Sequence, residues 1–132
     1  MSARHQDGAA RAAHAHALIS FDIDGTLEIG DPPGIVPIEL VRRAQARGYL
    51  IGSCSDRPVS YQQQLWAGLG IEPDFTVLKH CLADVRAQFT AAEAYYHIGD
   101  TDVDHHFAQH AGFHFFLADA DAHSAWGPLL FA

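Results

Sequence analysis

The sequence is poor in basic residues. It has 8 Lys and Arg against 16 Asp and Glu, which gives a formal net charge of −8, and Lys79 is its only lysine. A nucleic-acid-binding module needs cations to neutralise phosphates, so this balance disfavours that class without excluding it. A polybasic membrane anchor is excluded for the same reason.

Long hydrophobic runs and paired cysteines are also lacking. No run of about 18 apolar residues is present, so no membrane-spanning helix is expected. No apolar signal-peptide core precedes Ala17. Cys54 and Cys81 are the only cysteines, which gives no disulfide framework. We therefore expect a cytoplasmic protein in a reducing compartment.

The composition that remains is that of one globular domain. The chain has 132 residues, of which 48% are hydrophobic and 18% charged. A chain of this length can bury roughly two-thirds of its unfolded surface without a metal or disulfide. Residues 1–16 are rich in Ala and His and have no hydrophobic periodicity, so we expect a disordered tail there. Residues 17–132 are expected to form the domain.

From Ala17 onward, apolar runs alternate with amphipathic segments. Strands are predicted at 17–21, 49–54, 74–78, 95–99 and 113–117. Helices are predicted at 37–47, 58–69 and 82–89, and between 99 and 111. The segment 24–34 is rich in Gly and Pro and is predicted to form turns or a small hairpin flap. Strands that alternate with helices indicate βαβ units and a parallel α/β sheet.

Polar side chains follow four of the five predicted strands. Ligands bind beyond the carboxyl ends of the strands in open parallel sheets, so these residues are candidates for one site. The residues are Asp22, Asp24 and Thr26 after the first strand, Ser55 and Arg57 after the second, Lys79 after the third, and Asp100 and Asp104 after the fourth.

This set of residues fits a cation and a phosphoryl group. Carboxylates that lie close together repel one another, and a hard divalent cation such as Mg²⁺ removes the conflict and commonly bridges to phosphate. Lys79 and the helix that opens after Ser55 can hold the phosphate. A carboxylate such as Asp22 can attack phosphorus. Asp24 can then protonate the leaving oxygen and activate water.

In these motifs the chain resembles the haloacid dehalogenase-like (HAD) superfamily of phosphohydrolases. The first motif of that family matches residues 19–26, its second motif matches Ser55, its lysine matches Lys79, and its GDxxxD motif matches residues 99–104. The motifs stand in the family's order, each at a strand end. The fold implied is a three-layer Rossmann-like domain with five parallel strands in the order 5-4-1-2-3.

The resemblance also implies roles for single residues. Asp22 would be the nucleophile and a Mg²⁺ ligand, and Asp24 the general acid and base that binds Mg²⁺ through its carbonyl. Asp100 would be the third protein ligand of the metal. Ser55 and Lys79 would hold the phosphate. Supporting positions are Asp104, which would orient a metal-bound water or Lys79, together with Thr26 and Arg57; Arg57 is equally well read as a surface residue.

One departure from the family pattern is Asp56, where relatives often carry a small residue. Capping of the next helix is the favoured reading, and selection against highly charged substrates is the alternative. Ser53 is expected to point into the packing. The second Asp of the first motif, Asp24, argues for phosphate chemistry over dehalogenation.

No cap domain is expected. Only 28 residues separate Thr26 from Ser55 and 23 separate Ser55 from Lys79, which leaves no room for a cap beside the predicted helices. An open site of this kind would accept a phosphorylated macromolecule or small molecule, or be closed by a second subunit in a homo-oligomer.

The expected function is Mg²⁺-dependent phosphomonoester hydrolysis through an aspartyl-phosphate. Three alternatives stay open: a polynucleotide-end phosphatase, a phosphotransferase, and a non-catalytic module that binds phosphate and Mg²⁺. The histidines at 105, 106, 110 and 114 are expected to form a solvated helix face rather than a metal site. Cys54 is expected to be a buried, inert thiol. The apolar segment 126–131 is expected to pack on the domain, with a subunit interface as the alternative.

Overall fold

A computed structural model describes residues 17–120 and 127 of the chain. The expectations for the tail at 1–16 and for packing of the segment 126–131 concern residues outside the described ones. No helix within the described part is long and apolar enough to cross a membrane.

The described residues form a five-stranded parallel sheet in the order β3-β2-β1-β4-β5. This order is the predicted one read from the other edge. The strands are β1 (Leu18–Phe21), β2 (Leu50–Ser55), β3 (Phe75–Leu78), β4 (Tyr95–Gly99) and β5 (His114–Leu117). Because β1 is central and its neighbours β2 and β4 follow different crossovers, its carboxyl end lies at the switch point of the topology.

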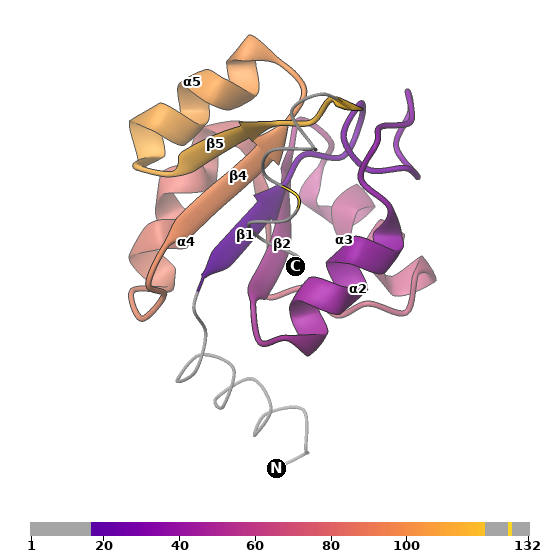
Figure 1. Cartoon of the computed structure of the whole chain (residues 1–132), viewed down its shortest axis with the longest axis horizontal. Coiled ribbons are helices and arrows are strands. Elements are labelled where there is room, and N and C mark those ends of the chain that lie inside the picture. Colours follow the sequence, from indigo (N-terminus) through magenta and orange to yellow (C-terminus); the bar gives the residue numbers. More distant parts are fainter. Residues whose placement is uncertain (1–16, 121–126, 128–132) are drawn as a thin grey trace.

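Helices cover both faces of the sheet, which gives the three predicted layers (Figure 1). The helices are α2 (Ile38–Ala46), α3 (Val59–Gly68), α4 (Leu82–Gln88) and α5 (Asp102–Ala111), and a short 3₁₀ helix, η1 (Lys79–Cys81), precedes α4. One core contains Val41 of α2 and Trp66 of α3. The other contains Val85 of α4 and Ala108 of α5. The helices therefore segregate in pairs.

Every residue of β1 is buried, because both faces of this central strand are covered. Ile19 and Phe21 belong to the core beneath α2 and α3, whereas Leu18 belongs to the core beneath α4 and α5. Ser20 alternates with Ile19 and Phe21 and so points to the face that carries α4 and α5. Ser20 is thus the one polar residue of β1.

The segment 24–34, between β1 and α2, forms turns and not the small hairpin that the sequence also allowed. It consists of turns joined by a single parallel bridge between Leu27 and Val36, so no hairpin forms there. The turns are held by backbone hydrogen bonds such as Val36 N to Thr26 O at 2.9 Å. Between the ends of β1 and β2 the chain adds only these turns and α2.

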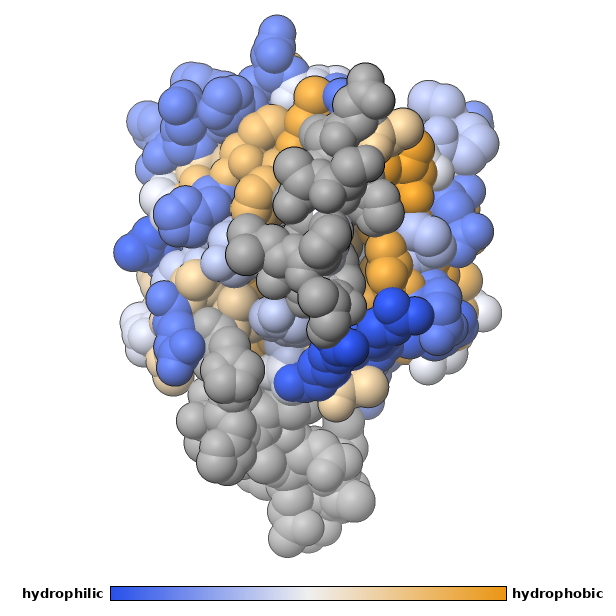
Figure 2. All heavy atoms as spheres, in the orientation of Figure 1, coloured by the Kyte–Doolittle hydropathy of each residue, from blue (hydrophilic) through white to orange (hydrophobic). Residues whose placement is uncertain are grey.

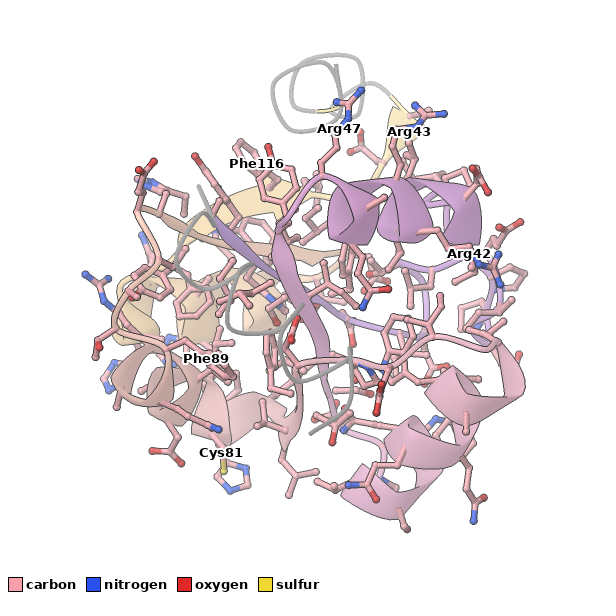
Figure 3. The ribbon with its side chains drawn as sticks, turned by 90° about the horizontal axis from the view of Figure 1, so that it is seen from below. Arg42, Arg43, Arg47, Cys81, Phe89 and Phe116 are labelled. Atoms are coloured by element: carbon pink, nitrogen blue, oxygen red, sulfur yellow. The ribbon has the colours of Figure 1, made fainter. Side chains whose placement is uncertain are left out.

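The basic side chains of α2 and of its C-cap are exposed at the periphery of the domain. Figure 3 shows Arg42, Arg43 and Arg47 extending outward from α2. Arg42 donates a hydrogen bond to the carbonyl of Leu69 at 2.7 Å, which ties α2 to the end of α3. The face seen in Figure 2 has apolar side chains near its middle and hydrophilic ones around its rim. The basic residues of α2 thus contribute to the rim and not to the core.

Candidate active site

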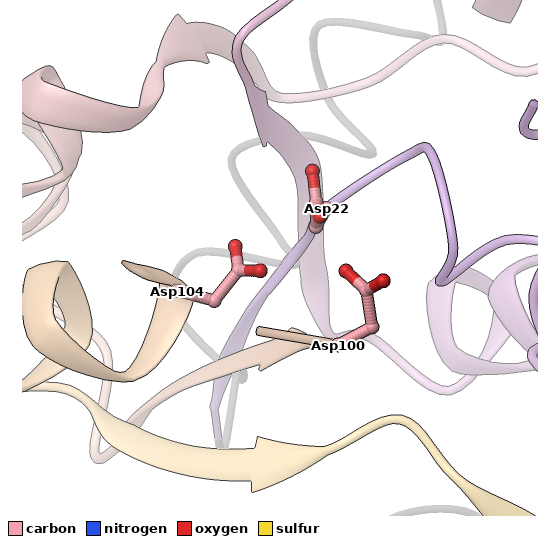
Figure 4. Close-up of side chains that lie close together, drawn as sticks. All are labelled: Asp22, Asp100 and Asp104. Carbon is pink, nitrogen blue, oxygen red and sulfur yellow. The ribbon is translucent and has the colours of Figure 1, made fainter. Parts of the chain in front are cut away.

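Three carboxyl groups converge beyond the carboxyl end of the central strands. Asp22 follows β1, Asp100 follows β4, and Asp104 lies in the first turn of α5. One oxygen from each lies within 4.8 Å of the others (Figure 4). The backbone N–H of Asp22 donates to Ile98 O at 2.9 Å, so β4 fixes the point at which β1 ends. The parallel sheet therefore brings together residues that are 78 or more positions apart in the chain, 22 and 100 or 104.

Lys79 is the cation of this cluster. Its Nζ lies 3.5 Å from Asp22 Oδ2 and 3.4 Å from Asp104 Oδ1, and its side chain is 9% exposed. Burial lowers the pKa of Lys79, but the carboxylates of Asp22 and Asp104 outweigh that effect and raise it overall. The lysine predicted from the sequence thus lies between two of the predicted carboxylates.

Asp22 is the strained member of the cluster. Burial and the charge of Asp104 raise the pKa of Asp22 well above its usual range, although Lys79 opposes the shift. The single positive charge of Lys79 does not balance the negative charges of Asp22, Asp104 and Asp100. A further cation at this position would relieve the repulsion.

Asp104 is the most firmly held member. Its Oδ2 accepts hydrogen bonds from the Thr101 hydroxyl at 2.9 Å and from the Thr101 N–H at 3.3 Å, which completes a capping box at the start of α5. Its Oδ1 accepts from His97 Nε2 at 3.0 Å. Burial alone would raise the pKa of Asp104, but His97, Lys79 and Thr101 lower it below its usual range.

Asp24 lies at the surface of the site and is held by different partners. Arg57 Nε donates to Asp24 Oδ2 at 2.7 Å, and the Asp31 N–H donates to Asp24 Oδ1 at 2.9 Å. Partial burial opposes ionisation, yet these bonds lower the pKa of Asp24 overall. The guanidinium of Arg57 also lies 4.9 Å from the centre of the Tyr61 ring. Arg57 therefore contacts the predicted acid–base residue directly.

Ser55 closes β2 beside this pair. It is buried, and its Oγ accepts the Arg57 N–H at 3.1 Å. Ser53 points into the packing as expected: its hydroxyl donates to Gln62 Oε1 at 2.6 Å and accepts from Trp66 Nε1 at 2.9 Å. Gln62 Nε2 in turn donates to the carbonyl of Arg57 at 2.8 Å. A buried network on α3 thus fixes the loop that carries Ser55 and Arg57.

Gly25 leaves the room that Asp100 occupies. Its φ of +76° lies in the left-handed region, and a Cβ built on it would overlap the Asp100 carboxyl group. Beside it, Thr26 Oγ1 is buried without a hydrogen-bond partner among the described residues. Gly25 therefore lets the chain turn close to Asp100.

One sequence prediction at this site is wrong. Asp56 was expected to cap the following helix, but Pro58 is the N-cap of α3 and no side chain caps it. The Asp56 side chain is 85% exposed, and its Oδ2 lies 3.7 Å from Lys79 Nζ. Because α3 begins at Val59 after its N-cap Pro58, Asp56 lies two residues before the N-cap and outside the first turn of the helix.

The other peripheral predictions agree with the structure. Among the described residues, the histidines of α5 and β5 belong to no group of three potential metal ligands. They are exposed: His106 stacks on His110 with ring centres 5.9 Å apart, and His105 stacks on Phe115 at 4.7 Å. Cys54 is buried, and burial raises the pKa of its thiol.

Two residues near the site escaped the sequence analysis, His97 and Gln62. Both are fully buried polar side chains. His97 lies two residues before the GDxxxD motif, and Gln62 lies within a helix that carries three consecutive glutamines. No spacing rule marks either of them, because their partners come from other elements of the fold.

The carboxyl cluster fits a hard divalent cation. It offers oxygen ligands only, which Mg²⁺ prefers over nitrogen or sulfur. The raised pKa of Asp22 indicates that the negative charge is under-compensated. Asp22 and Asp100 are the side chains best placed to hold the ion, since Asp104 is already occupied by His97, Thr101 and Lys79.

Comparisons with known proteins bear on the fold. No family model and no curated protein matches the chain. Among solved structures, the crystal structure of 3-deoxy-D-manno-octulosonate 8-phosphate phosphatase from Moraxella catarrhalis matches with a TM-score of 0.52. The match covers 82% of this chain and 70% of that chain at 19% sequence identity. That phosphatase is a HAD superfamily member. The chain has the HAD-like fold.

The structure of that phosphatase contains a magnesium ion, a phosphate ion and a KDO molecule. The HAD-like fold of the present chain carries its own cluster of three carboxyl groups that could hold a metal ion. The expectation of fold, strand order and an acidic group at the carboxyl edge is therefore confirmed. The roles of single residues stay predictions.

Proposed function

We propose that this protein is a Mg²⁺-dependent phosphomonoester hydrolase that acts through an aspartyl-phosphate at Asp22. The observation that carries the proposal is the buried cluster in which Lys79 lies between Asp22 and Asp104, with Asp100 beside them. Folding alone does not require a lysine and several carboxyl groups at the end of the central strand, because burying them is costly. A site for a phosphoryl group and a cation accounts for all of them.

In the first half-reaction a carboxylate oxygen of Asp22 attacks phosphorus, and the bond between phosphorus and the leaving oxygen breaks. Asp24 gives its proton to that oxygen, so the alcohol leaves as a neutral molecule. Lys79 and the N–H groups that follow Ser55 hold the phosphoryl oxygens. Asp22 is suited to this role because it directly follows the central strand and its carboxyl group lies 3.5 Å from Lys79 Nζ.

In the second half-reaction Asp24 accepts a proton from water, whose oxygen attacks the same phosphorus. The bond between phosphorus and Asp22 breaks, which releases inorganic phosphate and restores the free carboxylate. The contact between Arg57 and Asp24 supports this step, because it favours the ionised form of Asp24. Bound Mg²⁺, held by Asp22, Asp100 and the carbonyl of Asp24, would offset the negative charge of phosphate and carboxylates.

Between the predicted motifs the chain adds turns, α2, β2, α3 and β3, which supports an open site without a cap domain. We therefore propose a capless enzyme whose substrate is a phosphate ester on a small molecule or an exposed macromolecular group. A neighbouring subunit that closes the site is compatible with the same arrangement. The net charge of −8 disfavours polynucleotide ends as the substrate.

The test is phosphate release from p-nitrophenyl phosphate, with Mg²⁺ and with EDTA, by the full chain and by Asp22→Asn. Activity that requires both Mg²⁺ and Asp22 supports the proposal. Trapping of radiolabelled phosphate on the wild type but not on Asp22→Asn would identify the intermediate. Wild-type protein that binds Mg²⁺ but releases no phosphate from aryl, oligonucleotide or phosphoprotein substrates would contradict the proposal and favour a binding module. An added alcohol that becomes phosphorylated would instead indicate a phosphotransferase.

A further inference from the structure

A buried chain of hydrogen bonds runs beneath the carboxyl cluster, on the face of the sheet covered by α4 and α5. His97 of β4 and Ser20 of β1 are register neighbours. His97 Nδ1 lies 2.9 Å from Ser20 Oγ, and His97 Nε2 lies 3.0 Å from Asp104 Oδ1. All three side chains are fully buried. The imidazole therefore bridges the centre of the sheet and the first turn of α5.

The chain continues from Asp104 into the candidate site. Asp104 Oδ1, the oxygen that His97 contacts, also lies 3.4 Å from Lys79 Nζ. Lys79 Nζ then lies 3.5 Å from Asp22 Oδ2. The proposed nucleophile and the proposed phosphate-binding lysine are thus connected to His97 through one carboxyl oxygen.

Packing does not explain a polar group at position 97. The core on this face of the sheet consists of apolar residues such as Leu18, Leu82 and Ala108, and the ring of Phe115 lies 6.3 Å from that of His97. A buried imidazole costs free energy unless both ring nitrogens find hydrogen-bond partners. Two apolar residues at positions 97 and 20 would fill the same space without that requirement. The capping box already orients one oxygen of Asp104, whereas the oxygen that faces Lys79 is held by His97.

We propose that His97 is a positioning residue, which orients Asp104 Oδ1 and thereby places Lys79 against Asp22 and the substrate phosphate. The proposal rests on the phosphatase function proposed above. His97 itself touches neither the substrate nor the metal. Its Nε2 donates to Asp104, because an ionised carboxylate only accepts, and its Nδ1 then accepts the Ser20 hydroxyl proton.

Two amide variants separate the two contacts of the imidazole. The amide of His97→Gln can reach the position of Nε2 and donate to Asp104, whereas the shorter amide of His97→Asn reaches only the position of Nδ1, next to Ser20. His97→Phe keeps an aromatic ring and removes both contacts. Ser20→Ala removes the hydroxyl alone and leaves the contact with Asp104.

The first measurement is kcat and KM for p-nitrophenyl phosphate with Mg²⁺, at a temperature where unfolding curves show each variant to be folded. We expect His97→Phe and His97→Asn to lower kcat/KM by about 10- to 100-fold, the range for residues that orient an active-site group. His97→Gln and Ser20→Ala should stay within about 3-fold of wild type. If His97→Phe does not fold, the comparison of Gln with Asn decides. Equal activity of Gln and Asn would overturn the proposal.

The second measurement does not depend on activity. Lys79 is the only lysine, so protein labelled with ¹⁵Nζ-lysine gives a single side-chain signal from the site. We expect that signal to move in His97→Asn and to stay at its wild-type position in His97→Gln. An unmoved signal in both variants would overturn the proposal. If the wild-type protein shows no phosphatase activity but the signal still moves in His97→Asn, the positioning role of His97 is supported and the proposed phosphatase function is not.

Discussion

The two aspartates of the first motif lie two residues apart and in opposite environments. Asp22 is buried among other carboxyl groups, and its pKa is raised by burial and by Asp104. Asp24 is 29% exposed and paired with Arg57, and its pKa is lowered despite partial burial. Two chemically identical side chains thus acquire different properties, because Asp22 directly follows the buried central strand whereas Asp24 lies in the turn beyond it.

This difference fits the division of labour proposed for the two residues. The buried carboxyl group depends on Lys79 and on an added cation, whereas the exposed one depends on Arg57 and the Asp31 N–H. Pairs of titratable groups whose surroundings separate their pKa values are typical of acid–base sites. The experiments that follow either remove the difference or isolate one side of it.

The largest effect is expected from Lys79→Met, which leaves the buried side without its cation. We expect kcat/KM to fall by about 10²- to 10³-fold, as for loss of an electrostatic partner of the transition state. We also expect the metal-free protein to lose about 3 kcal/mol of unfolding free energy, because Asp22 and Asp104 stay buried and lose the cation that lies between them. Urea unfolding and steady-state kinetics measure the two effects.

The matched control is Asp56→Asn, which alters the exposed partner of the same lysine. Its unfolding free energy should match that of the wild type within about 0.5 kcal/mol, as is usual for surface substitutions. If Asp56→Asn lost as much unfolding free energy as Lys79→Met, the exposed contact of Lys79 would contribute as much stability as its buried contacts.

Gly25→Ala tests the space next to Asp24 that the Asp100 carboxyl group occupies. A Cβ at this position would overlap the Asp100 carboxyl group and would also meet an unfavourable positive φ. We expect a loss of roughly 2 kcal/mol in unfolding free energy and about 10-fold weaker Mg²⁺ binding by titration calorimetry.

Gly70→Ala provides the control for backbone strain. Gly70 has a φ of +69°, close to the +76° of Gly25, but a Cβ on it meets nothing within 4 Å. It should lose about 1 kcal/mol and keep normal Mg²⁺ affinity. Equal losses of stability and affinity in the two variants would show that Gly25 is needed for its φ alone.

Asp22→Asn is expected to stabilise the metal-free protein at alkaline pH. A raised pKa means that folded Asp22 retains a proton that the unfolded chain releases, so wild-type stability falls as the pH rises above about 4. Asparagine cannot ionise, and the variant should gain about 1 kcal/mol at pH 8 in EDTA. Thermal unfolding between pH 5 and pH 8 measures the slope.

Asp24→Asn should show the opposite sign. The lowered pKa of Asp24 means that its charge favours the folded state above pH 4, so its removal brings no gain at pH 8. Stabilisation of both variants would remove the contrast between the two aspartates and indicate a general effect of the net charge.

The smallest effect is expected from Arg57→Ala, which releases the exposed side. Loss of the guanidinium removes a contact that lowers the pKa of Asp24. The acidic limb of the pH dependence of kcat, where Asp24 acts as the base of the second half-reaction, should therefore move to higher pH, with a change of about 3- to 10-fold at pH 6. Arg57→Lys, which keeps the charge, should move the limb less. An acidic limb that stays in place in Arg57→Ala would separate Asp24 from the rate-limiting proton transfer.

The alternation of apolar runs and helical segments predicted the five strands and four helices of a parallel sheet, and the resemblance to the HAD superfamily predicted the strand order. Strand ends were predicted to within one or two residues, and β4 without error. The prediction succeeded because buried parallel strands are nearly continuous apolar runs, whose ends are marked by polar residues. The hairpin alternative for 24–34 and the capping role of Asp56 were wrong. The composition of a short segment does not fix the direction of a turn, nor the residue at which a helix begins after a proline.

For the site, the sequence by itself determined which residue types gather at the carboxyl edge. Asp22, Lys79, Asp100 and Asp104 follow strand ends, and parallel strands bring their ends to one edge. The contacts among these residues come from the packing of the folded chain. Lys79 lies between Asp22 and Asp104, and Arg57 donates a hydrogen bond to Asp24. His97 contacts Asp104 through one ring nitrogen and Ser20 through the other. The physical reason is that periodicity along the chain fixes which face a side chain occupies, whereas charge interactions depend on distances of a few ångströms between elements, which are set by packing across the sheet.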